Sequence, residues 1–248
     1  MSEVVVIGLG QLGRVFAGAL LRAGRTVVPV NRDDDARSVA AAHPAPELVL
    51  VAVGEADLAR ALAEMPFIWR DRVALIQNEL LPRDWEAHGY AGPTVISVWF
   101  EKKTGSDAKP LIPSPVAGPG ARLLIDALAT VDLPARAVAT GDALLFELVV
   151  KNVYILTTNL AGLKTGGTVA ELWRDHRPFA RAVATDVIAL QEALTGRSFD
   201  PEHLIAGMLD AFAGDPGHRC TGRSAPTRLK RALARADAFG LAVPTLRT

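Results

Sequence analysis

The stretch "VVVIGLGQLGRVFAGALLRAGRTVVPVNR", residues 4–32, decides the fold of this chain. It begins with a run of β-branched residues and passes through three closely spaced glycines. It continues as an apolar segment of helical character and ends in a second β-branched run. A strand, a glycine turn, a helix and a second strand in this order predict a parallel β–α–β unit.

The same alternation continues to about residue 100. We expect strands at residues 4–7, 27–30, 48–53, 73–76 and 94–98, and helices at 12–23, 34–42, 56–65 and 82–88. The strands are apolar on both faces, which is typical of a parallel sheet covered by helices on each side. Further on, "KPLIPSPVAGPG" (109–120) carries four prolines, so any strand there is expected at a sheet edge or in a hairpin.

After residue 140 the chain changes to helical segments. We expect them at residues 140–163, 167–196, 200–214 and 225–240, with no further strand. The fold class is therefore α/β, with an N-terminal Rossmann-type doubly wound sheet (1–138) and a C-terminal all-helical domain (139–248).

Composition excludes several classes of function. The 248 residues carry 27 basic and 27 acidic side chains, and zero net charge gives no long-range attraction to nucleic acid or anionic membranes. One cysteine, Cys220, excludes an internal disulfide, and the five histidines show no metal-ligand spacing. The N-terminus lacks a basic signal region, and no uninterrupted apolar run approaches about 20 residues. We expect a cytoplasmic protein without a metal site.

Gly8, Gly10 and Gly13 have the spacing G-x-G-x-x-G between an apolar strand and a helix. In that context Gly8 permits a tight turn, Gly10 lets a pyrophosphate approach the backbone, and Gly13 lets helix and strand pack closely. The N–H groups and positive end of the helix then face the pyrophosphate. The motif predicts a dinucleotide-binding site.

The end of the second strand indicates which dinucleotide binds. Folds that bind NAD usually carry Asp or Glu there for the ribose hydroxyls, whereas this chain has Asn31 and Arg32. Asn can donate to a 2′-phosphate and Arg can pair with it, so NADP(H) is the expected cofactor. We expect the aspartates that follow, residues 33–35, to cap the next helix and face solvent.

The segment "KNVYILTTN", residues 151–159, lies within the first helical segment. It resembles the K-x-x-x-N-x-x-x-N helix of the ketopantoate reductase (2-dehydropantoate 2-reductase) family, with Lys151 and Asn159 in the lysine and last asparagine places. Residues i and i+8 share a helix face. "IQN" (76–78) and "ARADAFGLAVPT" (234–245) also resemble segments of that family.

The resemblance implies reduction of a 2-oxo acid by NADPH. Lys151 is then the acid that stabilises and protonates the carbonyl oxygen, Asn159 binds substrate, and Asn78 lies near nicotinamide and substrate. The lysine pKa of about 10.4 needs lowering by burial or a neighbouring cation. Homodimerisation through the helical domain is a further possibility. The expected cofactor contacts are Gly8, Gly10, Gln11, Leu12, Gly13, Asn31, Arg32, Val53 and Asn78.

The chain departs from the family pattern at three places. Ile155 replaces the middle asparagine, and Asn152 points about 100° away from the Lys151 face. Gly54-Glu55 stands where the family usually has a lysine after the third strand. Ser224 occupies the place of its substrate-binding glutamate, in a basic region. We expect Ser224 and Arg223 in the substrate site, with Arg223 or Arg228 favouring a more acidic substrate than ketopantoate.

Two other functions are compatible with these motifs. One is a dehydrogenase of the 6-phosphogluconate or imine-reductase kind, which combines the same two domain types. The other is a sensor or regulatory protein that binds NADP without turnover.

Overall fold

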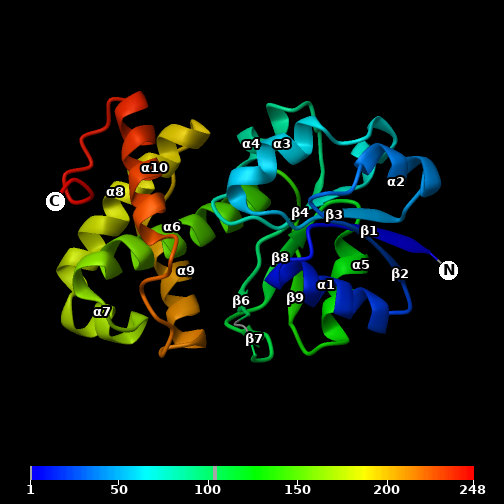
Figure 1. The fold of residues 1–248 in the computed structure, drawn as a ribbon. Helices are drawn as coiled ribbons and strands as arrows, with labels where there is room; N and C mark the ends of the chain where they lie inside the picture. Colours follow the sequence, from blue (N-terminus) through cyan, green and yellow to red (C-terminus); the bar gives the residue numbers. More distant parts are fainter. Residues whose placement is uncertain (1, 103–104) are drawn as a thin grey trace. The chain divides into compact units, whose positions relative to one another are not determined.

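The structure, a computed structural model, describes residues 2–102 and 105–248. The chain folds into two compact units, Met1–Glu147 and Leu148–Thr248 (Figure 1). The division falls inside helix α6 (Asp142–Thr165), whereas the sequence analysis places the boundary between residues 138 and 139. Arg136 pairs with Glu147 at 2.5 Å, which ties the start of α6 to the first unit.

The first unit is built on a seven-stranded sheet with the order β2-β1-β3-β4-β5-β8-β9. All neighbours are parallel except β5 and β8, which are antiparallel. This confirms the doubly wound α/β prediction. The strands are β1 (Glu3–Ile7), β2 (Thr26–Val30), β3 (Leu48–Val51), β4 (Val73–Leu75), β5 (Thr94–Ile96), β8 (Ser114–Ala117) and β9 (Ala135–Ala137).

Helices cover both faces of this sheet. Helix α1 (Gln11–Arg22) and α5 (Ala121–Ala129) share one core with the strands, in which Phe16 and Leu124 are fully buried. The opposite face is covered by α2 (Ala36–Ala42), α3 (Leu58–Ala63) and α4 (Pro82–Glu86) (Figure 1). Two 3-10 turns, η1 (Glu55–Asp57) and η2 (Phe67–Arg72), flank α3.

The proline-rich segment follows the sequence prediction only in part. Strands β6 (Phe100–Glu101) and β7 (Lys109–Pro110) form the expected hairpin-like pair. Strand β8, however, lies inside the sheet between β5 and β9, so the prediction of an edge strand was wrong there. Pro115 has no N–H group to donate, but its carbonyl oxygen accepts a hydrogen bond from Ser97 N at 2.9 Å. The strand therefore tolerates proline at this position. Helix α5 and strand β9 were not predicted.

The second unit is helical, as predicted. It contains most of α6 together with α7 (Val169–Asp175), α8 (Arg177–Thr195), α9 (Pro201–Gly214) and α10 (Ala225–Ala238). Asn152 on α6 donates to Gln191 on α8 at 2.9 Å, and the rings of Tyr154 and Phe212 join α6 to α9. These contacts make α6 the central helix of the unit (Figure 1).

Helix α6 is long and apolar enough to cross a membrane by length and composition, although Glu147, Lys151 and Asn152 interrupt its apolar run. In the structure 72% of its most apolar window is buried. The core helix of a soluble protein meets the same criteria, so this helix is weak evidence for a membrane span.

Helix α1 approaches strand β1 closely at Gly13. A methyl group on Gly13 would lie 2.0 Å from the Gly8 carbonyl oxygen, so only glycine fits without a shift of the backbone. Gly8 itself has a φ of 93°, which favours glycine at the turn. The third glycine of the motif is thus explained by packing.

We predict that Gly13→Ala destabilises the fold by at least about 2 kcal/mol, because overpacking against a backbone atom cannot be relieved by a rotamer change. Gly18→Ala in the same helix is the matched control. Its added methyl group would meet nothing within 4 Å, so it should be neutral or stabilise by up to about 1 kcal/mol. Urea unfolding of both variants measures the difference, and equal stabilities would contradict the close-packing explanation.

Candidate functional site

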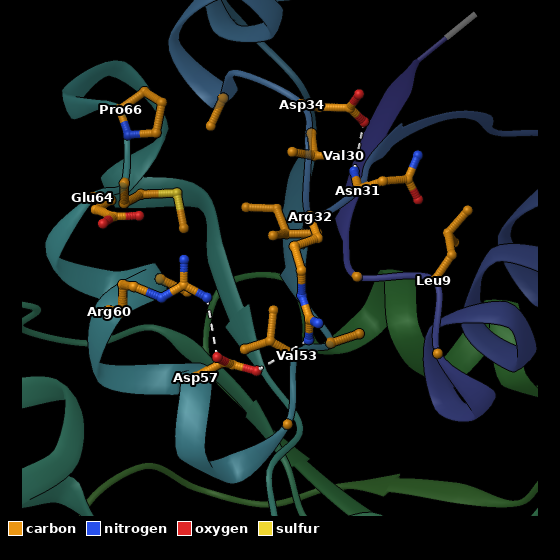
Figure 2. A pocket seen from close by; sticks show the side chains of 18 residues that line it. Leu9, Val30, Asn31, Arg32, Asp34, Val53, Asp57, Arg60, Glu64 and Pro66 are labelled. Carbon is orange, nitrogen blue, oxygen red and sulfur yellow. Dashed lines mark hydrogen bonds and ion pairs between the residues drawn. The ribbon is translucent and has the colours of Figure 1, made fainter.

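A pocket of about 450 Å³ lies in the first unit beyond the carboxyl ends of β1, β2 and β3 (Figure 2). The chain passes from β1 outward to β2 and then back across β1 to β3. Ligands of open α/β sheets bind at such a change of direction, because the loops after the strands diverge there. The glycine turn after β1 and the Val53 loop after β3 both contribute to the lining.

The glycine turn leaves space for a ligand at the start of α1. Gly10 is the residue before the helix, and a methyl group on it would meet nothing within 4 Å. Because Gly10 has no side chain, it makes no capping hydrogen bond to the amide groups of the first helical turn. A helix N-terminus of this kind attracts anions such as a pyrophosphate.

Asn31, Arg32 and Asp34 line the pocket after β2. The backbone N–H of Asn31 donates to Asp34 Oδ2 at 2.7 Å, and Figure 2 shows the Asp34 carboxylate next to Asn31. Asp35 caps α2 by accepting from the amides of residues 37 and 38, and the Ser38 hydroxyl bond lowers its pKa. The capping prediction is confirmed for Asp35. It is wrong for Asp34, which closes the turn at Asn31 and lines the pocket.

Three charged residues in this pocket, Asp57, Arg60 and Glu64, were not predicted as site residues. Asp57 ends η1 and Arg60 lies one turn later on α3. Asp57 pairs with Arg60 at 3.0 Å and with Arg32 at 3.8 Å, so one carboxylate lies between two guanidinium groups (Figure 2). Asp57 and Arg60 are three residues apart, a spacing that brings opposite charges together on a helix. This signal was present in the sequence.

The remaining predicted cofactor residues lie elsewhere. Gln11, Leu12 and Gly13 form the first turn of α1, and Asn78 is half-buried after β4; none of the four belongs to the described pocket lining. Beside Asn78, the buried Gln77 donates to the carbonyls of Val51 and Val53, at 2.7 and 3.2 Å. Gln77 therefore holds the ends of β3 and β4 together, a role that the sequence analysis missed.

The second unit contains a buried lysine. Lys151 on α6 is 9% exposed, and its Nζ lies 5.4 Å from the centre of the Tyr154 ring. Burial, together with the Arg228 guanidinium, lowers the pKa of Lys151 to about 7. Such a lysine exchanges a proton near neutral pH, as an acid or base in catalysis must.

Asn159, about two helical turns beyond Lys151 on α6, is bonded to Arg228. Arg228 on α10 donates from Nη1 to Asn159 Oδ1 at 3.0 Å, which joins α10 to α6. Ile155 is buried between the two α6 positions, and Asn152 bonds to Gln191 instead, which confirms that it faces another way. Of the two arginines considered, Arg228 is the one with a described bond to the helix that carries Lys151.

Arg223 and Ser224 are both exposed near the start of α10. Ser224 occupies the capping position of that helix without a side-chain capping bond. The contacts described for these two residues do not bring them to Lys151, so their predicted role in substrate binding stays a prediction.

No protein-family model and no curated protein matches this chain. Solved structures do. A 2-dehydropantoate 2-reductase from Methylococcus capsulatus superposes with a TM-score of 0.68 at 16% identity, covering 99% of this chain and 93% of the other. A dimeric ketopantoate reductase from Staphylococcus aureus gives 0.66 at 16% identity, with coverage of 99% and 95%.

D-mandelate dehydrogenase, in its complex with NADH, is also similar, with a TM-score of 0.66, 15% identity and coverage of 99% and 95%. Identities this low demonstrate a shared fold and nothing finer. The chain therefore has the fold of the ketopantoate reductases, as the motifs of the sequence predicted.

Proposed function

We propose that this protein is an NADPH-dependent reductase that converts a 2-oxo acid into the hydroxy acid. The observation that carries the proposal is the buried Lys151, which has a pKa of about 7 and lies about two helical turns before Asn159 on α6. The neighbours of known structure, ketopantoate reductases and D-mandelate dehydrogenase, support the same reaction class.

The pocket of the first unit fits a dinucleotide. Gly10 leaves open space at the start of α1, where a pyrophosphate meets helical amides. Arg32 and Arg60 offer two guanidinium groups for a 2′-phosphate, which would take over part of the pairing now supplied by Asp57. When bound, the reduced nicotinamide supplies the hydride.

Lys151 is the proposed acid. As a carbonyl is reduced, negative charge develops on its oxygen, and a protonated Lys151 beside that oxygen stabilises the charge and donates the proton. Asn159, about two helical turns further along α6, is the proposed substrate amide, and Asn78 is the proposed contact near the nicotinamide. We also propose a homodimer, because one neighbour is dimeric; sedimentation equilibrium distinguishes it from a monomer.

NADPH oxidation, followed by absorbance with a panel of 2-oxo acids, tests the reductase proposal. We expect turnover that Lys151→Ala lowers by at least about 100-fold. Because the acid must be protonated, kcat/KM should be level below about pH 7 and fall tenfold per pH unit above it. Tight NADPH binding without turnover of any carbonyl would instead favour a sensor.

The choice of cofactor is tested by the two pocket arginines. We expect Arg32→Ala and Arg60→Ala each to weaken NADPH binding by about tenfold, the loss of one charge-assisted contact, and to leave NADH binding nearly unchanged. Arg37→Ala, on α2 outside the described pocket lining, is the control. Fluorescence titrations give all dissociation constants. An equal loss for both cofactors would contradict recognition of a 2′-phosphate.

Lys151 should also reduce stability, since a buried ammonium loses its hydration. Between the unfolded pKa of 10.5 and the folded value of about 7, the unfolded chain holds a proton that the folded chain lacks. Stability therefore falls as the pH drops through this window and is level below it. Lys151→Met should stabilise the protein at pH 7 by up to about 4 kcal/mol.

This gain should shrink as the pH rises from 8 to 10, where the unfolded lysine also loses its proton. Lys230→Met, at an exposed position of α10, is the control and should change stability little at any pH. Urea denaturation at several pH values measures both. A Lys151→Met variant less stable than wild type at pH 7 would show that the lysine is a structural residue.

A further inference from the structure

Gln77, two residues after β4, carries a buried carboxamide with three hydrogen bonds. Its Nε2 donates to the carbonyl oxygens of Val51 at 2.7 Å and Val53 at 3.2 Å. Its Oε1 accepts from the backbone N–H of Ile76 at 3.1 Å, and the residue is 8% exposed. Because a carboxamide has two N–H donors and only its nitrogen can donate to carbonyls, this network fixes the orientation of the group.

The Gln77 carboxamide continues the link between β3 and β4 beyond the end of their backbone pairing. The last paired residues of the two strands are Val51 and Leu75. The chain then turns at residues 78 and 79, where Glu79 has a φ of 58°, a conformation that costs energy for a residue other than glycine. Gln77 therefore supplies through its side chain the donors that a paired backbone would supply, and it extends the link to the loop after β3.

This loop, residues 52–54, is one wall of the pocket beyond β1, β2 and β3, since all three of its residues line that pocket. On the side of β1, Ala52 N donates to the Ile7 carbonyl oxygen at 2.8 Å. On the side of β4, Gln77 donates to the Val53 carbonyl oxygen. The loop is thus held from both neighbouring strands, on one side by the backbone and on the other by a single side chain.

We propose that Gln77 is a positioning residue for the dinucleotide: it fixes the loop of residues 52–54 through Val53, and thereby strengthens the binding of NADPH and NADH alike. This inference rests on the proposed function, in which the pocket holds a dinucleotide. Gln77 lies outside the described pocket lining, so it acts through the loop. A loop that is loose in the free protein must be ordered on binding, and the conformational entropy lost then weakens affinity.

Fluorescence titrations of the full chain with NADPH and with NADH test this role in Gln77→Met. Methionine is similar in length to glutamine and donates no hydrogen bond, so both dissociation constants should rise about tenfold. Gln77→Asn keeps two N–H donors on a shorter stem and should give intermediate values. Without ligand, the backbone amides of residues 52–57 should exchange hydrogen faster in Gln77→Met than in wild type.

Gln191→Met is the matched control. Gln191 on α8 is 1% exposed, and its Oε1 accepts from Asn152, so the same substitution removes a buried hydrogen bond in the other unit. This variant should lose thermal stability, as Gln77→Met does, and keep both dissociation constants of wild type. Thermal unfolding shows which variants are folded at the titration temperature. Where Gln77→Met is unfolded, Gln77→Asn against Gln191→Asn gives the same comparison.

The proposal would be overturned by a folded Gln77→Met that binds both dinucleotides as wild type does, or that loses affinity for NADPH only. A loss of affinity equal to that of Gln191→Met would also overturn it. A wild type that binds neither dinucleotide would reject the proposed function. In that case, faster exchange of residues 52–57 in Gln77→Met would still uphold Gln77 as the residue that positions this wall of the pocket, and unchanged exchange would reject that role too.

Discussion

Helix α1 and the end of strand β1 meet backbone to backbone at Gly13 and Gly8, and the pocket beyond β1, β2 and β3 depends on that contact. The separation is so small that a single methyl group on Gly13 would lie 2.0 Å from the Gly8 carbonyl oxygen. Because the helix starts this close to the strand end, its first amides face the region between the loops after β1 and β3, where the pocket lies. The side chains of Phe16 and Leu20 then reach the sheet and complete its core.

Helix α6 combines two opposing physical demands. Its apolar surface is needed to hold the helical unit together, as the buried Val149 and Val153 show. Lys151 lies between them in sequence and is nearly as buried, which lowers its pKa to about 7 and costs stability. Natural proteins tolerate such a cost chiefly at functional positions, which is the physical ground for giving Lys151 a role in catalysis.

Sequence reasoning was successful where the governing interaction is local. The glycine motif spans six residues, and the strand, turn and helix that it predicts are those of the structure. It was less successful where segments distant in sequence meet. The pairing of Asp57 with Arg32 depends on where the loop after β3 ends. The choice of Arg228 over Arg223 likewise depends on the rotation of α10 against α6, and no periodicity within one helix encodes that rotation.

Two departures from the ketopantoate reductase pattern, at positions 155 and 224, both replace a polar group that the family carries. Ile155 and Ser224 stand where the family has a middle asparagine and a glutamate, two polar groups suited to a hydroxylated substrate. In this chain one position is apolar and buried, while α10 supplies Arg228, a charge of the opposite sign to glutamate. Under the proposed reductase function, both differences remove partners for hydroxyl groups of a substrate, so we expect a substrate other than ketopantoate. The fold is thus retained around Lys151, while the neighbouring positions are those expected to set a different substrate.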